Sequence, residues 1–166
     1  MDNNTVRIAV GLRLGAAICH PHTCCHCGVE VDHLATHGLN CRKSEGRFFR
    51  HAALNEIVHR ALSSANIPSR LEPVGISCSN GKRPDGVSLV PWERGRLLVW
   101  DATCSDTYAP SYITSAASEA GIVASQAEER KIRKYDHLDA SLQFTPVAVE
   151  TTGVFGPRTK TFFSGA

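Results

Sequence analysis

The sequence predicts an α/β domain preceded by a small module rich in cysteine and histidine. Segments typical of a helix, three strands, a helix and a strand follow one another after residue 46. By contrast, five of the seven cysteines fall between Cys19 and Cys41. We therefore expect an N-terminal module over residues 1–45 and one domain over residues 46–166. The composition, 42% hydrophobic and 20% charged residues, is that of a globular protein.

The first helix and three strands are predicted in order. Apolar residues at helical spacing, among them Leu54 and Val58, predict a helix over 48–64. The strands are expected over 70–76, 85–90 and 96–104, joined by turns at 77–81 and 91–95. Asn80-Gly81 in the first turn is typical of a hairpin.

A second helix is expected over 115–138, followed by a strand over 144–150. Because the last strand is reached through a helix, it can give the sheet mixed pairing. Alternating steps of three and four place one set of residues on a single helical stripe. Its members are Ala117, Ala120, Ala124, Ala127, Lys131, Lys134 and Leu138. The alanines predict that this stripe faces the sheet, so the two lysines should point the same way.

The N-terminal module carries the spacing of a zinc site. Cys24 and Cys27 form one close pair and His37 and Cys41 a second, and four such ligands suit tetrahedral Zn²⁺. Clustered cysteines in a chain without a disulfide pattern indicate metal binding in a reducing compartment. The ligand register stays open, because other candidates lie nearby. Cys25 can replace Cys24, His33 can replace His37, and Cys19, His20, His22 and His26 are further spares.

Two aspartates are the candidates for a second metal site. Asp85 begins the second predicted strand and Asp101 lies late in the third, so a hairpin between these strands brings the carboxylates together. Paired carboxylates bind Mg²⁺ well, because Mg²⁺ prefers oxygen ligands. Asp101 also follows Leu98-Val99-Trp100, where a carboxylate needs a cationic partner.

These residues resemble the PD-(D/E)xK nuclease superfamily. Pro84-Asp85 matches the first half of its motif, and Asp101-x-Thr103 matches the second half except that Thr103 stands where lysine is expected. The resemblance implies a restriction-endonuclease-like core. It also implies that the missing lysine comes from the second helix, as Lys134 or Lys131.

Over residues 19–150 the chain looks more closely like the restriction-like endonuclease domain of site-specific non-LTR retrotransposons. That family places a Cys-Cys-His-Cys zinc motif before a basic-Pro-Asp and acidic pattern, here Arg83-Pro84-Asp85 and Asp101. The resemblance implies a hydrolase that nicks double-stranded target DNA with Mg²⁺ or Mn²⁺, beside a structural zinc. It also implies a reverse transcriptase in the parent polypeptide, and a nuclear location if the element is eukaryotic.

The remaining roles follow from this expectation. Lys82, Arg83 and Arg130 are candidate phosphate contacts, and Glu56 is a weaker candidate for the acid on the first helix, since its helical angle points away from the apolar face. One alternative is a catalytically inactive nucleic-acid-binding zinc module derived from such a domain, which Thr103 favours. A further alternative is a protein-interaction domain stabilised by zinc, which the net charge of only +2 favours. No apolar run of about 18 residues predicts a membrane span.

Overall fold

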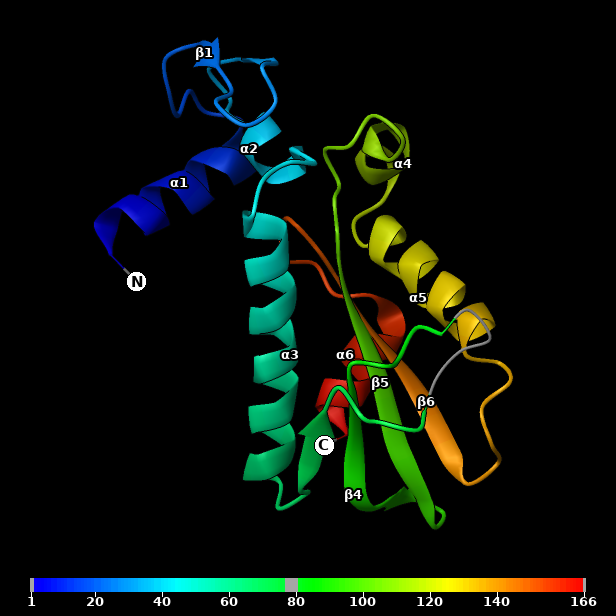
Figure 1. The fold of residues 1–166 in the computed structure, drawn as a ribbon. Helices are drawn as coiled ribbons and strands as arrows, with labels where there is room; N and C mark the ends of the chain where they lie inside the picture. The colour runs from blue at the N-terminus through cyan, green and yellow to red at the C-terminus, as the bar shows by residue number, and fades with distance from the viewer. Residues whose placement is uncertain (1, 77–80, 166) are drawn as a thin grey trace.

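The computed structural model describes residues 2–76 and 81–165. Within these ranges, helices cover both faces of one four-stranded sheet (Figure 1). Helix α3 (Gly46–Ser64) lies on one face and helix α5 (Ile122–Lys134) on the other. The α/β class is therefore confirmed.

The sheet is mixed, in the strand order β3-β4-β5-β6. Strands β3 (Ser69–Leu71), β4 (Gly86–Glu93) and β5 (Arg96–Ser105) pair antiparallel. Strand β6 (Leu142–Glu150) pairs parallel to β5 along nine residues, from Leu97↔Leu142 to Ser105↔Glu150. Mixed pairing was expected because a helical crossover precedes β6.

Strand β5 sends alternate side chains to two different layers. Leu98, Trp100 and Ala102 belong to the main core. Helix α3 contributes Leu54, Val58 and Leu62 to this core, and helix α6 (Pro157–Ser164) contributes Phe162. On the opposite face, Ala124 and Ala127 of α5 pack on Ala148 of β6. The small alanines bring α5 close to the sheet, which places its C-terminal turn beside the polar residues of β5.

The strand boundaries differ from those predicted. β3 ends at Leu71, because Glu72 has φ +48° and leaves the extended conformation. β4 continues through Pro91 to Glu93, so the turn predicted over 91–95 is wrong in extent. The actual turn is Arg94-Gly95, both with positive φ, as tight hairpins require. The other predicted turn, 77–81, lies largely outside the described residues.

The helix predicted over 115–138 is two helices, α4 (Ile113–Ser118) and α5. Gly121 separates them with φ +88°, a conformation that side-chain-bearing residues rarely adopt. α5 runs only from Ile122 to Lys134, so Ala117, Ala120 and Leu138 are not part of its stripe, and the two alanines are exposed. On α3, the apolar residue Ile57 is 48% exposed and lies outside the buried face.

The N-terminal segment contains α1 (Asn3–Leu14), β1 (His22–Thr23), β2 (Glu30–Val31) and α2 (His37–Asn40). Neither α1 nor α6 was predicted. Asp2 caps α1 by accepting hydrogen bonds from the N–H groups of Asn4 and Thr5. None of the helices in the described part of the chain is long and apolar enough to cross a membrane.

Polar contacts join this segment to the sheet domain. Arg13 of α1 donates to the Thr152 carbonyl at 2.8 Å. Asn40 of α2 donates to the Tyr108 carbonyl at 3.0 Å, and Arg50 of α3 donates back to the Leu39 carbonyl at 2.9 Å. These bonds place the Cys-rich segment above the end of the sheet where β5 finishes (Figure 1).

Candidate metal centres

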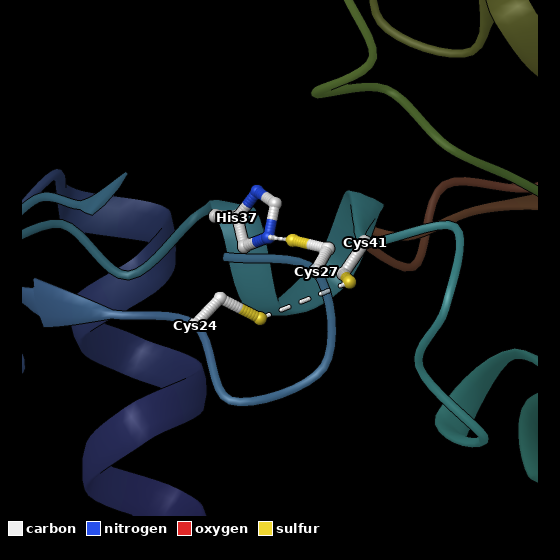
Figure 2. Close-up of side chains that lie close together, drawn as sticks. All are labelled: Cys24, Cys27, His37 and Cys41. Atoms are coloured by element: carbon white, nitrogen blue, oxygen red, sulfur yellow. Dashed lines mark hydrogen bonds between the residues drawn. The ribbon is translucent and has the colours of Figure 1, made fainter. Parts of the chain in front are cut away.

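Four candidate ligands of the N-terminal segment come together in one cluster. Cys24 follows β1, Cys27 lies in the turn toward β2, and His37 and Cys41 stand at the two ends of α2. Their ligand atoms all lie within 4.8 Å of one another. Figure 2 shows the four side chains pointing toward a common centre.

The local backbone explains why these side chains converge. The Gly28 N–H donates to the Cys24 carbonyl at 2.8 Å, closing a turn that Gly28 permits with φ +78°. The Cys24 N–H then donates to the Val29 carbonyl at 2.8 Å, which folds the chain back on itself. On α2, the four-residue step from His37 to Cys41 puts both ligands on one helical face.

The sulfur positions suit a tetrahedral ion. The Cys24 and Cys41 Sγ atoms lie 3.9 Å apart, and Cys27 Sγ lies 3.1 Å from His37 Nε2. Two thiolates at about 2.3 Å from a tetrahedral Zn²⁺ are separated by about 3.8 Å. The chain could therefore hold a metal ion such as zinc at this cluster.

The electrostatics of the cluster also favour a cation. Hydrogen bonds from the backbone N–H groups of Cys27 and His26 lower the pKa of Cys24 to about 6. At Cys27 the Val29 N–H acts in the same direction, but burial and the Cys24 and Cys41 thiols outweigh it and raise the pKa. A thiolate that is already stabilised binds a metal more readily at neutral pH.

The spare ligands lie outside this group of four. Cys25, His26 and His33 are exposed. Cys19 donates its S–H to the Asp32 carbonyl at 3.3 Å, and His22 approaches the His20 carbonyl at 2.9 Å. Among the open registers, the structure thus brings together Cys24 with Cys27 and His37 with Cys41.

A second cluster lies where β4 begins. Gly86 pairs with Trp100, and the Asp85 N–H donates to the Trp100 carbonyl at 3.0 Å, so Asp85 lies beside Asp101. Asp85 Oδ2 accepts the Ala102 N–H at 2.6 Å. Asp85 and Asp101 share this cluster with His51 of α3, their ligand atoms all within 4.8 Å of one another.

Both lysines of the predicted stripe reach Asp101 from α5. Asp101 is 4% exposed, and its two carboxylate oxygens accept from different ammonium groups. Lys131 Nζ bonds Oδ1 at 2.5 Å and Lys134 Nζ bonds Oδ2 at 2.9 Å. Lys134 also contacts the Tyr135 hydroxyl at 2.8 Å. Two cations around one buried carboxylate leave an excess positive charge beside Asp85.

Sequence reasoning missed His51, the residue that α3 contributes to this cluster. Its Nε2 lies 3.1 Å from Asp85 Oδ2, and this hydrogen bond raises the pKa of His51 above its ordinary value. Burial opposes ionisation of Asp85, but the bonds from His51 and the Ala102 N–H keep its pKa below normal. A signal was present: His51 and Asn55 are polar residues one turn apart, next to the apolar positions of the helix.

Glu56, the acid suggested on the first helix, lies away from the cluster. Its side chain is 54% exposed and pairs with Arg60 at 3.9 Å along the outer face of α3. Thr103 lies two residues beyond Asp101 on β5, opposite Ala148 of β6. Glu56 does not belong to the grouping of Asp85, Asp101 and His51.

The candidate phosphate contacts are exposed. Lys82 and Arg83 are exposed just before Asp85, and the Arg83 carbonyl accepts from the Tyr135 hydroxyl at 3.1 Å. Arg130 is exposed on α5, with its guanidinium 5.6 Å from the Tyr112 ring centroid. Comparison of the chain with protein-family models and with curated proteins gave no match.

Proposed function

We propose that this chain is a metal-dependent endonuclease that hydrolyses a phosphodiester bond of double-stranded DNA. The observation that carries the proposal is the meeting of two carboxylates and two ammonium groups where β4 begins, beside the middle of β5. The order of α3, three antiparallel strands, helices and a parallel strand supports a core of the restriction-endonuclease type. The Cys-rich cluster before it supports the likeness to the retrotransposon domains.

Asp85 and Asp101 are the proposed ligands of Mg²⁺ or Mn²⁺, because these ions prefer oxygen donors and bind through one or two carboxylates. When bound, such a cation would polarise the phosphodiester and favour ionisation of a water molecule. The residues fit this role, since both carboxylates belong to one compact cluster beside exposed basic side chains.

The two lysines receive different roles in this proposal. Lys134 is held by Asp101 and by the Tyr135 hydroxyl, so it orients Asp101. Lys131 bonds the other carboxylate oxygen of Asp101, and its positive charge opposes the rise in the pKa of His51. We therefore assign to Lys131 the stabilisation of negative charge on the phosphoryl oxygens, with Lys134 as the alternative.

A plasmid-nicking assay tests this function. Wild type should nick in Mg²⁺ or Mn²⁺ and lose activity in EDTA. Asp85→Asn and Asp101→Asn should each abolish nicking, whereas Asp139→Asn, which alters an exposed turn away from the cluster, should not. Circular dichroism at matched concentration checks folding. A folded wild type that never nicks contradicts the proposal, and an active Asp85→Asn variant shows that the site is elsewhere.

The second candidate is a nucleic-acid-binding module that has lost catalysis. Two observations favour it: Thr103 replaces the motif lysine, and both oxygens of Asp101 already accept from ammonium groups. Under either function, Lys82, Arg83 and Arg130 should give DNA affinity that falls steeply with salt, because phosphate contacts release counterions. Salt-dependent binding without nicking selects this candidate, and no binding at low salt excludes both.

A further inference from the structure

A chain of hydrogen bonds runs from the buried core to Asp85. The Trp100 indole N–H donates to Asn55 Oδ1 at 3.3 Å. Asn55 Nδ2 in turn lies 3.4 Å from His51 Nδ1, and His51 Nε2 lies 3.1 Å from Asp85 Oδ2. Trp100 is fully buried and Asn55 is 8% exposed, so neither can exchange its partner for water easily.

The polarity of this chain can be worked out from its buried end. An indole N–H can only donate, so the Asn55 atom that faces it must be the carbonyl oxygen. The amide nitrogen of Asn55 then faces His51, and an amide nitrogen can only donate. His51 Nδ1 must therefore be the acceptor, which leaves the proton of the neutral ring on Nε2. That proton points at Asp85.

We infer that His51 is a positioning residue that donates from Nε2–H to Asp85 and is not itself a ligand of the cation. This inference rests on the proposed function, because it concerns the cation that Asp85 and Asp101 would bind. A ring that bound a cation through Nε2 would need its proton on Nδ1, directly opposite the donor group of Asn55. The side chain of Asn55 thus excludes the ligand form of His51.

Several donors hold the carboxylate of Asp85. Oδ2 accepts from both His51 Nε2 and the Ala102 N–H, and the side chain of Asn55 also donates to this carboxylate. With His51 excluded, the protein offers only carboxylate oxygens from this cluster, a ligand set suited to Mg²⁺ or Mn²⁺ rather than to softer ions.

The tautomer can be measured without any assay of activity. Long-range ¹H–¹⁵N spectra at alkaline pH, where imidazoles are neutral, distinguish the protonated from the unprotonated ring nitrogen. The signals of His51 are those missing from His51→Gln. We expect Nε2 to carry the proton in wild type and Nδ1 to carry it in Asn55→Asp, whose carboxylate accepts. A wild-type His51 protonated on Nδ1 overturns the inference.

Cation binding provides the second measurement, made by calorimetry with Mn²⁺ on the zinc-loaded protein. His51→Ala should weaken binding about 10-fold, as loss of a residue that orients a ligand does. His51→Gln, which can still donate an N–H to Asp85, should recover part of that loss. His59→Gln is the matched control, because His59 lies on the same helix but contacts Ser69.

Pulsed EPR of bound Mn²⁺ should show no directly bonded nitrogen. A nitrogen ligand that disappears in His51→Gln, or equal affinity of the Gln and Ala variants, overturns the inference. The inference is also overturned if the wild-type protein binds no more Mn²⁺ than the Asp101→Ala variant does. If these measurements agree with expectation but the protein does not nick DNA, the proposed function fails while the role of His51 stands.

Discussion

At the scale of single residues, Asp101 is a carboxylate whose single negative charge is paired with two positive charges. It is buried, and two lysines from successive turns of α5 bind its two oxygens. One lysine suffices to balance its charge, so the second adds little to stability. In the proposed function, the second ammonium group serves to meet an anion such as phosphate.

Stability measurements on lysine variants test this arrangement. Lys131→Met or Lys134→Met alone should reduce the free energy of unfolding by about 1 kcal/mol or less, because the other ammonium remains. The double variant leaves Asp101 buried without a partner and should cost about 3–5 kcal/mol. Urea titration of the three variants and wild type closes a double-mutant cycle. If the losses in unfolding free energy of the two single variants simply add up to that of the double variant, the two lysines do not share the compensation of Asp101.

Gly86, next to Asp85, is needed for close packing. A Cβ at this position would lie 2.0 Å from Cζ2 of Trp100, whose ring is fully buried and cannot move aside. Gly86→Ala should therefore destabilise the fold by about 1–3 kcal/mol through overpacking. Gly38→Ala is the control, because a Cβ there meets no atom within 4 Å. Thermal unfolding of both variants gives the comparison, and equal melting temperatures would refute it.

At the scale of elements, glutamates that are distant in the sequence accept hydrogen bonds from the first turns of two helices. Glu150, at the end of β6, accepts the N–H of Val123 in the first turn of α5 at 3.1 Å. Glu128 of α5 accepts from the N–H groups of Arg158 and Thr159 at the start of α6. Thr159 extends this contact, since its hydroxyl donates to Glu128 and accepts the Ala148 N–H. Buried acids thus hold α5, α6 and β6 together.

This linkage predicts unequal effects for two neighbouring glutamates. Glu128→Gln replaces an acceptor of three hydrogen bonds and should cost about 1–3 kcal/mol, because buried donors lose their partners. Glu129→Gln removes only a surface pair with Arg158 at 3.5 Å and should cost about 0.5 kcal/mol or less. Denaturant titration compares them, and limited proteolysis should release α6 first in Glu128→Gln. Similar stabilities would rule out this capping role.

At the scale of the whole molecule, the two parts are stabilised in different ways. The sheet domain buries a continuous core from α3, α6, β5 and β6. In the segment from Cys19 to Cys41, the buried hydrophobic residues are Val31 and Cys41 alone, in a part of the chain that is described throughout. A metal held by the cysteine and histidine cluster would therefore supply much of the folding free energy of that segment.

Metal removal should accordingly unfold one part and spare the other. A strong chelator should raise amide hydrogen exchange between Cys19 and Cys41, while the amides of β5 and β6 keep their protection. Cys41→Ser should reproduce this result, and Cys25→Ser, at an exposed position, should not. Hydrogen exchange with mass spectrometry makes the measurement. Global unfolding in chelator would show that the parts are not independent.

Much of the architecture was predictable, because periodicity and ligand spacing are local properties. Side chains alternate between the two faces of a strand, so neighbours such as Trp100 and Asp101 must face opposite ways, and the stripe on the second helix predicted the direction of Lys131 and Lys134. The close spacing of four cysteine and histidine ligands likewise predicted a cluster. The break at Gly121 escaped this reasoning, since alanines continue the helical pattern on both sides of it.

Other features depended on tertiary structure because they join residues with no sequence relation. The sequence alone determined the class of fold, the pairing of Asp85 with Asp101 and the set of candidate zinc ligands. Only the folded chain decided that Cys24 rather than Cys25 joins the cluster, and that α3 contributes His51 instead of Glu56. The rotation of α3, which turns His51 rather than Glu56 toward the cluster, depends on packing against Trp100 and its neighbours. Those contacts bridge 45 residues between Asn55 and Trp100, beyond the reach of any local pattern.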